Sequence, residues 1–161
     1  MQKFHIDTPV SAESILKENS QIILVDASDS IGISPRINRK NVIDVIDHRP
    51  LHEKHAFPHA TFHIEMVGSS ATLIAEKFYL EKIVISPESA ALLYSAIISN
   101  TVNFKATVTT ERDTIMTNWL LQFLVLPLNY THEMFKAKST FTRPLQEIFK
   151  EVFGSYLCGN K

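Results

Sequence analysis

The feature that most constrains the fold is a mostly aliphatic run that ends abruptly in three polar side chains. The run covers residues 42–46, and Asp47, His48 and Arg49 follow it directly. In α/β proteins, a short buried strand often carries chemically active side chains at its carboxyl end. The stretch therefore predicts a strand that leads into a functional site. The alternative is that the strand leads only into a polar turn that ends at Pro50, because the same residue pattern occurs in such turns.

A second run of the same design lies earlier in the chain. Residues 22–25 are all aliphatic and are followed by Asp26, a pattern that suits a strand buried on both faces. Parallel neighbours need a crossover of about a dozen residues or more, and the connection 27–41 supplies 15. If the two strands pair in parallel, Asp26 projects into the same crevice as Asp47 and His48.

The rest of the chain is dominated by helical patterns. Ala71 begins an apolar stripe at helical spacing. Ser86 and Pro87 are typical of the start of a second helix. Thr110 and Asp113 have the spacing of a capping box, which predicts the start of a third. The predicted helices cover 11–19, 71–78, 87–99, 111–123, 130–138 and 144–153, and a short edge strand is expected at 61–65. The expected fold class is α/β, with a partly parallel sheet flanked by helices and a mostly helical second half.

Length and composition narrow the function classes. A chain of 161 residues favours one domain, expected over 1–153, with 154–161 as a tail or the start of a linker. Its 16 basic and 17 acidic residues show no basic excess, so nucleic acid is not an expected partner. With no signal-peptide pattern and no apolar run of about 18 residues, no membrane contact is expected. The lone Cys158 excludes an internal disulfide and fits a cytoplasmic location.

Asp26 and His48 are candidate ligands for a divalent metal. Carboxylate and neutral imidazole suit Mn²⁺, and carboxylates also suit Mg²⁺. The alternative is that Asp26 caps a turn and His48 makes a local hydrogen bond. Arg49 carries a permanently charged fork that matches phosphate, unless it forms a surface salt bridge with Asp44, Glu53 or another acid.

Two further patterns each have a structural alternative. The histidines at 48, 52, 55, 59 and 63 have helical spacing, but Pro50 and Pro58 interrupt a helix there. A loop with surface imidazoles is therefore favoured over a zinc site. Residues 68–70 open a helix whose free N–H groups would favour an anion, or they simply cap that helix.

Several of these segments together resemble a known family. Asp47-His48-Arg49 is similar to the Asp-His-His signature of the DHH phosphoesterase superfamily. The segments that resemble the manganese-dependent (family II) inorganic pyrophosphatases are 23–26, 65–72, 93–101, 104–105, 109–110 with Asp113, and 134–138. The likeness covers most of residues 10–153, with the segments in the same order.

The resemblance implies an α/β domain with a parallel sheet and a two-metal centre, usually Mn²⁺ or otherwise Mg²⁺. That centre would hydrolyse a phosphoanhydride or a phosphodiester in a phosphate-containing small molecule. Asp26 and His48 fall on metal-ligand positions, and Asn100 falls where the family has a ligand aspartate. The catalytic residues implied are Asp47, His48 and Arg49, and the substrate-binding residues implied are Arg49 and Lys105.

The sequence also departs from the family pattern. Residues 1–20 hold no counterpart of the family's first metal-binding motif, which resembles His-x-Asn-Pro-Asp-x-Asp, and the substrate-clamping C-terminal domain has no counterpart either. We therefore expect a partial pyrophosphatase-like domain with weak or no hydrolysis. The alternative is a non-catalytic relic that binds a phosphate compound or a protein partner. A missing strand would leave an open sheet edge, so self-association is also expected.

Overall fold

A three-stranded parallel sheet positions the polar residues singled out in the sequence. The computed structural model describes residues 4, 6–30, 33–50, 53–140, 144, 146 and 147. Its strands are β1 (Ile22–Val25), β2 (Val42–Asp47) and β3 (Thr61–Ile64), in the order β1-β2-β3 with both pairs parallel. The predicted α/β fold class is confirmed, and so is the parallel pairing of the two aliphatic runs.

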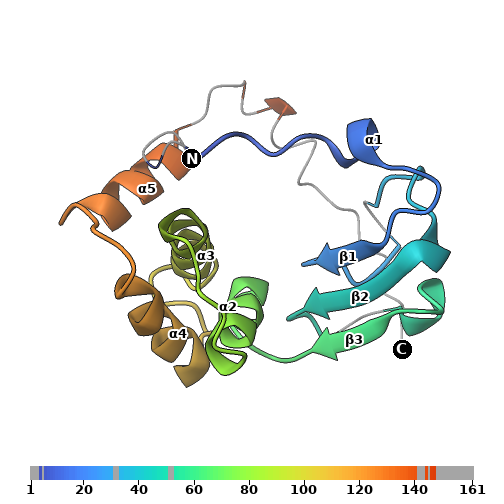
Figure 1. Ribbon diagram of the computed structural model, residues 1–161. Helices are drawn as coiled ribbons and strands as arrows, with labels where there is room; N and C mark the ends of the chain where they lie inside the picture. The colour runs from blue at the N-terminus through green and yellow to red at the C-terminus, as the bar shows by residue number, and fades with distance from the viewer. Residues whose placement is uncertain are drawn as a thin grey trace, which may run out of the picture. The chain divides into compact units, whose positions relative to one another are not determined.

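The strand register brings the carboxyl ends of the strands together. Val25 lies opposite Ile46, and the amide of Asp26 donates to the Ile46 carbonyl at 2.9 Å, which extends the pairing by one residue. Asp26 therefore leaves the sheet beside Asp47, and His48 follows at once. Figure 1 shows that all three strands point toward the group formed by α2, α3 and α4.

Within the part of the chain that the structure describes, two apolar clusters pack against the sheet. On one side, Leu24, Val42, Val45 and Phe57 form a buried cluster with residues from the connecting segments. A second cluster joins Ile46 on β2 to residues at and after the start of α2, namely Val67 and Leu73. Each aliphatic run thus stabilises the fold by leaving water.

The prediction that the first aliphatic run is buried on both faces is wrong. β1 is an edge strand, so Leu24 is buried while Ile23 and Val25 are 57% and 46% exposed. β2 lies between two strands and is largely buried along its length. The sequence pattern is the same in both runs, and their place in the sheet decides the difference.

The helices begin largely where local capping predicts. They are α1 (Ala12–Ile15), α2 (Ser70–Leu80), α3 (Pro87–Asn100), α4 (Glu111–Leu121) and α5 (Tyr130–Lys138), with single 3₁₀ turns η2 (Arg39–Asn41) and η3 (Lys54–Ala56). The Ser69 side chain accepts from the Ala71 amide and the Ser86 side chain from the Ser89 amide. These bonds satisfy N–H groups that the first turn of a helix leaves free. α1 is shorter than the predicted 11–19, because the backbone becomes extended at Leu16.

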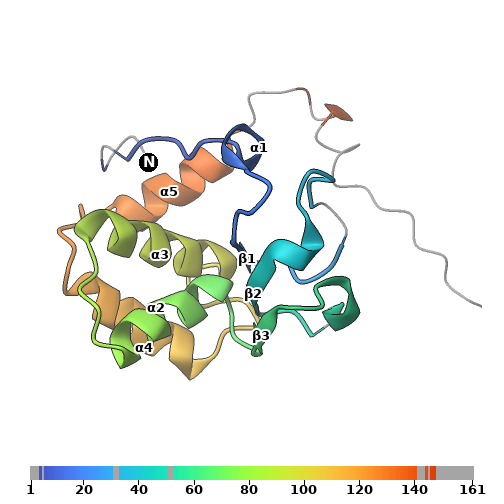
Figure 2. The same ribbon diagram turned by 45° about the vertical axis from the view of Figure 1, so that its right-hand side comes forward.

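The chain divides into two compact units, Met1–Leu126 and Pro127–Lys161. The first unit holds the sheet and the mutually packed helices α2, α3 and α4, which Figure 2 shows side by side. The second unit holds α5. The division falls inside the single domain predicted over 1–153. Most of the helix predicted at 144–153 and all of the tail at 154–161 lie outside the described residues.

Candidate metal centre

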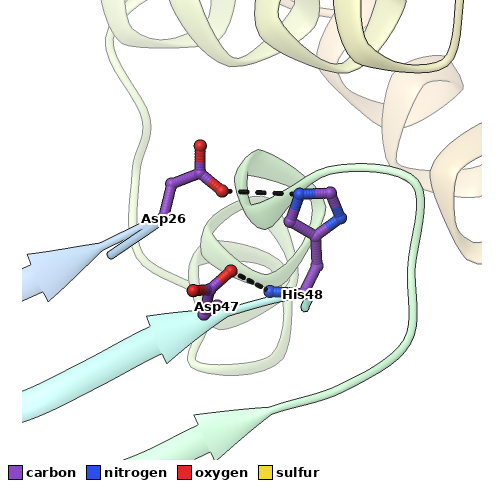
Figure 3. Close-up of side chains that lie close together, drawn as sticks. All are labelled: Asp26, Asp47 and His48. Atoms are coloured by element: carbon purple, nitrogen blue, oxygen red, sulfur yellow. Dashed lines mark hydrogen bonds and ion pairs between the residues drawn. The ribbon is translucent and has the colours of Figure 1, made fainter. Parts of the chain in front are cut away.

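Asp26 and His48 meet at the carboxyl ends of β1 and β2. His48 Nε2 lies 3.4 Å from Asp26 Oδ1, and the His48 and Asp26 side chains are 20% and 56% exposed. Figure 3 shows the imidazole turned toward the Asp26 carboxylate, with Asp47 below them. Among the described residues, Asp26, Asp47 and His48 are the one group of three potential metal ligands, with donor atoms within 4.8 Å of one another.

The second ring nitrogen of His48 fixes the orientation of the imidazole. His48 Nδ1 lies 2.9 Å from the Val67 carbonyl. A carbonyl oxygen can only accept, so Nδ1 carries the proton and donates. In the neutral ring, the lone pair of Nε2 then faces the Asp26 carboxylate. Two acceptors facing each other are stabilised by a cation between them, and a hydrogen bond from the far nitrogen to a carbonyl is the usual support of a metal-ligating histidine.

Asp26 is held through both its backbone and its side chain. Its φ is +61°, a left-handed conformation that aspartate adopts more readily than most residues. Its carbonyl accepts from Arg49 Nη2 at 3.1 Å, and its Oδ1 accepts from Ser70 Oγ at 3.0 Å. Ser70 is thus an orienting residue that the sequence suggested only as part of a helix start.

Asp47 is fully buried, and its carboxylate is saturated with hydrogen bonds. Oδ1 accepts from the amides of His48 (2.6 Å) and Arg49 (3.2 Å). Oδ2 accepts from Nε (2.9 Å) and Nη2 (2.7 Å) of Arg49. A carboxylate offers about four such positions. Burial alone would raise the pKa of Asp47, but hydrogen bonds from Arg49 and from the His48 amide hold that pKa below its ordinary value.

Arg49 is anchored to the acidic cluster. Besides Asp47, its guanidinium bonds the Asp26 carbonyl through Nη2 and Asp29 Oδ2 through Nη1 at 3.3 Å. The hydrogen bond with Asp47 raises the pKa of Arg49 above its ordinary value. The side chain is still 41% exposed, so part of its positive charge faces solvent.

The other two sequence candidates lie at and after the end of α3. Asn100, at the end of α3, donates from Nδ2 to Ser69 Oγ at 3.2 Å, at the start of α2. Lys105 is exposed in the turn after α3, where residues 102–104 adopt positive φ.

The histidine series does not gather into a cluster. His55 and His59 are exposed, while His63 pairs with Asp44 across the sheet at 3.3 Å. His52 lies outside the described residues. Among the described residues, none of these three histidines belongs to a group of potential metal ligands.

Asp113 is a buried anchor behind the metal centre that the sequence indicated only as a helix cap. Its carboxylate accepts from the Gly68 amide (2.9 and 3.1 Å), from Thr72 Oγ1 (2.5 Å) and from the amide and hydroxyl of Thr110 (2.7 and 2.8 Å). Burial would raise the pKa of Asp113, but these donors hold it below its ordinary value. Asp113 thereby fixes Gly68, the neighbour of the Val67 carbonyl that orients His48.

Comparison with known proteins identifies relatives of this chain. The chain is 29% identical over 160 residues to a probable manganese-dependent inorganic pyrophosphatase of Clostridium acetobutylicum, a match that covers 98% of this chain and 51% of that protein. It is 31% identical to the manganese-dependent inorganic pyrophosphatase of Methanothrix thermoacetophila, over 86% of this chain and 44% of that protein. No protein-family model matches the chain.

A solved structure shares both the fold and the sequence pattern. It is a crystal structure of a Methanococcus jannaschii protein assigned to the family II inorganic pyrophosphatases. The TM-score is 0.64 at 33% identity, and the match covers 73% of this chain and 41% of that one. The chain thus spans about half the length of the relatives it matches. Within the described residues, no helix is both long enough and apolar enough to cross a bilayer.

Proposed function

Because this chain is homologous to the manganese-dependent, family II inorganic pyrophosphatases over about half of their length, we propose that it is a metal-binding, pyrophosphatase-like hydrolase domain. The observation that carries the proposal is the pair formed by Asp26 and His48, in which Nε2 of the imidazole lies 3.4 Å from Oδ1 of the carboxylate. The proposed cofactor is Mn²⁺, and the proposed substrate class is a phosphoanhydride such as pyrophosphate.

The donor set fits one divalent cation. Asp26 offers a carboxylate oxygen and His48 an imidazole nitrogen, both accessible to solvent, and Mn²⁺ accepts both kinds of ligand. A cation held there would act as a Lewis acid toward a phosphoryl oxygen. Ser70 and the Val67 carbonyl orient the two ligands. The partly exposed Arg49 places a positive charge beside them that would attract an anion.

The same geometry favours weak hydrolysis by this chain alone. Asp47 has no free position for a metal, and Asn100 is neutral, so it adds no negative charge to the centre. In-line displacement between two metals requires both the attacking and the leaving oxygen to be stabilised. This observation supports the second candidate function, a non-catalytic domain that binds a phosphate compound through Arg49 and one metal.

Phosphate release tests the proposal. Pyrophosphate, a short polyphosphate and a dinucleotide are incubated with the chain and Mn²⁺ or Mg²⁺, before and after removal of metal with a chelator. Turnover should depend on metal and should be lost in His48→Ala. His59→Ala, which removes an exposed imidazole outside the centre, should behave as the parent chain. Metal-dependent binding of the phosphate compounds without turnover would favour the second candidate, and turnover that survives His48→Ala would contradict the proposal.

Self-association is a further expectation for this domain. Among the described residues, no strand pairs with the outer edge of β1, and Ile23 and Val25 are exposed. Open apolar edges favour pairing with another chain. Sedimentation at tens of micromolar should show oligomers. Ile23→Lys should shift them to monomers, whereas Leu80→Lys, on an exposed site at the end of α2, should not. A parent chain that sediments as a clean monomer would contradict the expectation.

A further inference from the structure

We propose that the guanidinium of Arg49 is a permanent positive charge of this centre and that it binds the Asp47 carboxylate where a metal ion would otherwise bind. A divalent cation bound by this chain is then held by Asp26 and His48 without Asp47. The inference rests on the proposed function, since it concerns how this chain's residues share one acidic site between a metal and an arginine.

The hydrogen bonds of Asp47 leave its carboxylate no free acceptor position. Both of its oxygens already accept two donors, and two of the four donors are guanidinium nitrogens. The backbone amides belong to the turn after β2 and cannot leave without unfolding that turn. The guanidinium is the one group that a side-chain substitution can remove. Arg49 therefore decides whether Asp47 has a free lone pair.

The guanidinium of Arg49 lies between two of the potential metal ligands. Nη2 bonds both Asp47 Oδ2 and the Asp26 carbonyl, so it lies between the two acidic residues of the potential ligand group. The potential ligand atoms of Asp26, Asp47 and His48 lie within 4.8 Å of one another, a spacing that lets one ion contact all three. A cation that reached Asp47 would therefore meet the positive charge of Arg49 at close range, which is unfavourable.

The centre contains more negative than positive side chains. The carboxylates of Asp29 and Asp47 pair with the guanidinium of Arg49, and the carboxylate of Asp26 adds a third negative charge nearby. One arginine leaves two negative charges, and a single divalent cation neutralises those two. Removal of the Arg49 charge should therefore strengthen metal binding, whereas an arginine that only binds substrate would leave metal affinity unchanged.

Calorimetric titration of the full chain with Mn²⁺ tests the inference. Arg49→Gln removes the charge and frees Asp47, so Mn²⁺ should bind about tenfold more tightly or better. Arg49→Lys keeps a positive charge and should bind Mn²⁺ about as the parent chain does. The double variant Asp47→Asn with Arg49→Gln loses the third ligand and should lose most of the gain.

A thermal measurement covers the case in which Arg49→Gln folds poorly. Without the guanidinium, Asp47 is a buried, unpaired carboxylate and the metal-free variant should be destabilised. Mn²⁺ should then raise its melting temperature by more than that of the parent chain, because binding to the folded state alone stabilises it. An Arg49→Gln variant that binds Mn²⁺ no better than the parent, or that stays unfolded in saturating Mn²⁺, overturns the inference and leaves the proposed function standing. A parent chain that binds no Mn²⁺ overturns both.

Discussion

Asp113→Ala should lower the free energy of unfolding by about 3–5 kcal/mol, a large part of the stability of a small domain. The carboxylate of Asp113 is fully buried and accepts from the Gly68 amide, from Thr72 Oγ1 and from two donors of Thr110. Alanine leaves those donors buried without an acceptor, and each such group costs about 1–3 kcal/mol. Urea denaturation followed by circular dichroism measures the loss.

The neighbouring acid provides the control for this prediction. Glu111 lies in the same first turn of α4 but is exposed, so Glu111→Ala should cost no more than about 1 kcal/mol. If the two alanine variants were equally stable, Asp113 would not be the anchor described above.

Acid titration gives Asp113 a second readout. Its pKa in the folded state lies below the ordinary value of 3.8, so the unfolded chain takes up the proton first as the pH falls. The stabilisation by the Asp113 charge is thus complete above about pH 5 and is lost as the pH drops through 3.8 toward the folded-state pKa. Asp113→Asn cannot titrate and should show a shallower loss of stability over this acid range, although it starts from a lower stability. An equally steep acid loss in Asp113→Asn would contradict the assignment.

The sequence predicted the sheet because local pattern and topology agree there. Two aliphatic runs that each end in an acid, separated by 15 residues, are compatible with few arrangements other than parallel neighbours. The pattern could not show that β1 is an edge strand, since exposure of Ile23 and Val25 depends on which strands are present beside it. Helix starts were predictable for a similar reason, because caps act within one turn.

The proximity of Asp26 and His48 followed from the predicted pairing, whereas the residues that hold them did not. Val67 contributes a backbone carbonyl and Ser70 a hydroxyl from the start of α2. The residue types at these two positions do not indicate that they contact residues far away in the chain. Likewise, the capping-box spacing of Asp113 predicted its bond to Thr110 but not the bond to Gly68, which comes from 45 residues away.

Gly68→Ala should lower the free energy of unfolding by about 2–3 kcal/mol, because the site has no room for a methyl group. A Cβ at Gly68 would lie 2.6 Å from Thr101 Cγ2 and 2.8 Å from Asp113 Oδ2. The backbone cannot retreat freely, since the Gly68 amide is bonded to that same carboxylate. Thermal denaturation of parent and variant measures the effect, and an Ala variant as stable as the parent would show that the contact relaxes without cost.

A double variant separates crowding from other causes. Thr101→Ser removes the Cγ2 atom nearest the new methyl and keeps the hydroxyl that donates to the Ile97 carbonyl. It should therefore restore part of the stability lost in Gly68→Ala. The same pair also probes the metal centre, since a displaced Gly68 shifts the adjacent Val67 carbonyl and with it His48 Nδ1. Mn²⁺ affinity should then fall in Gly68→Ala and recover in parallel with stability, because supporting hydrogen bonds of metal ligands typically change affinity about 10–100-fold when they are disturbed.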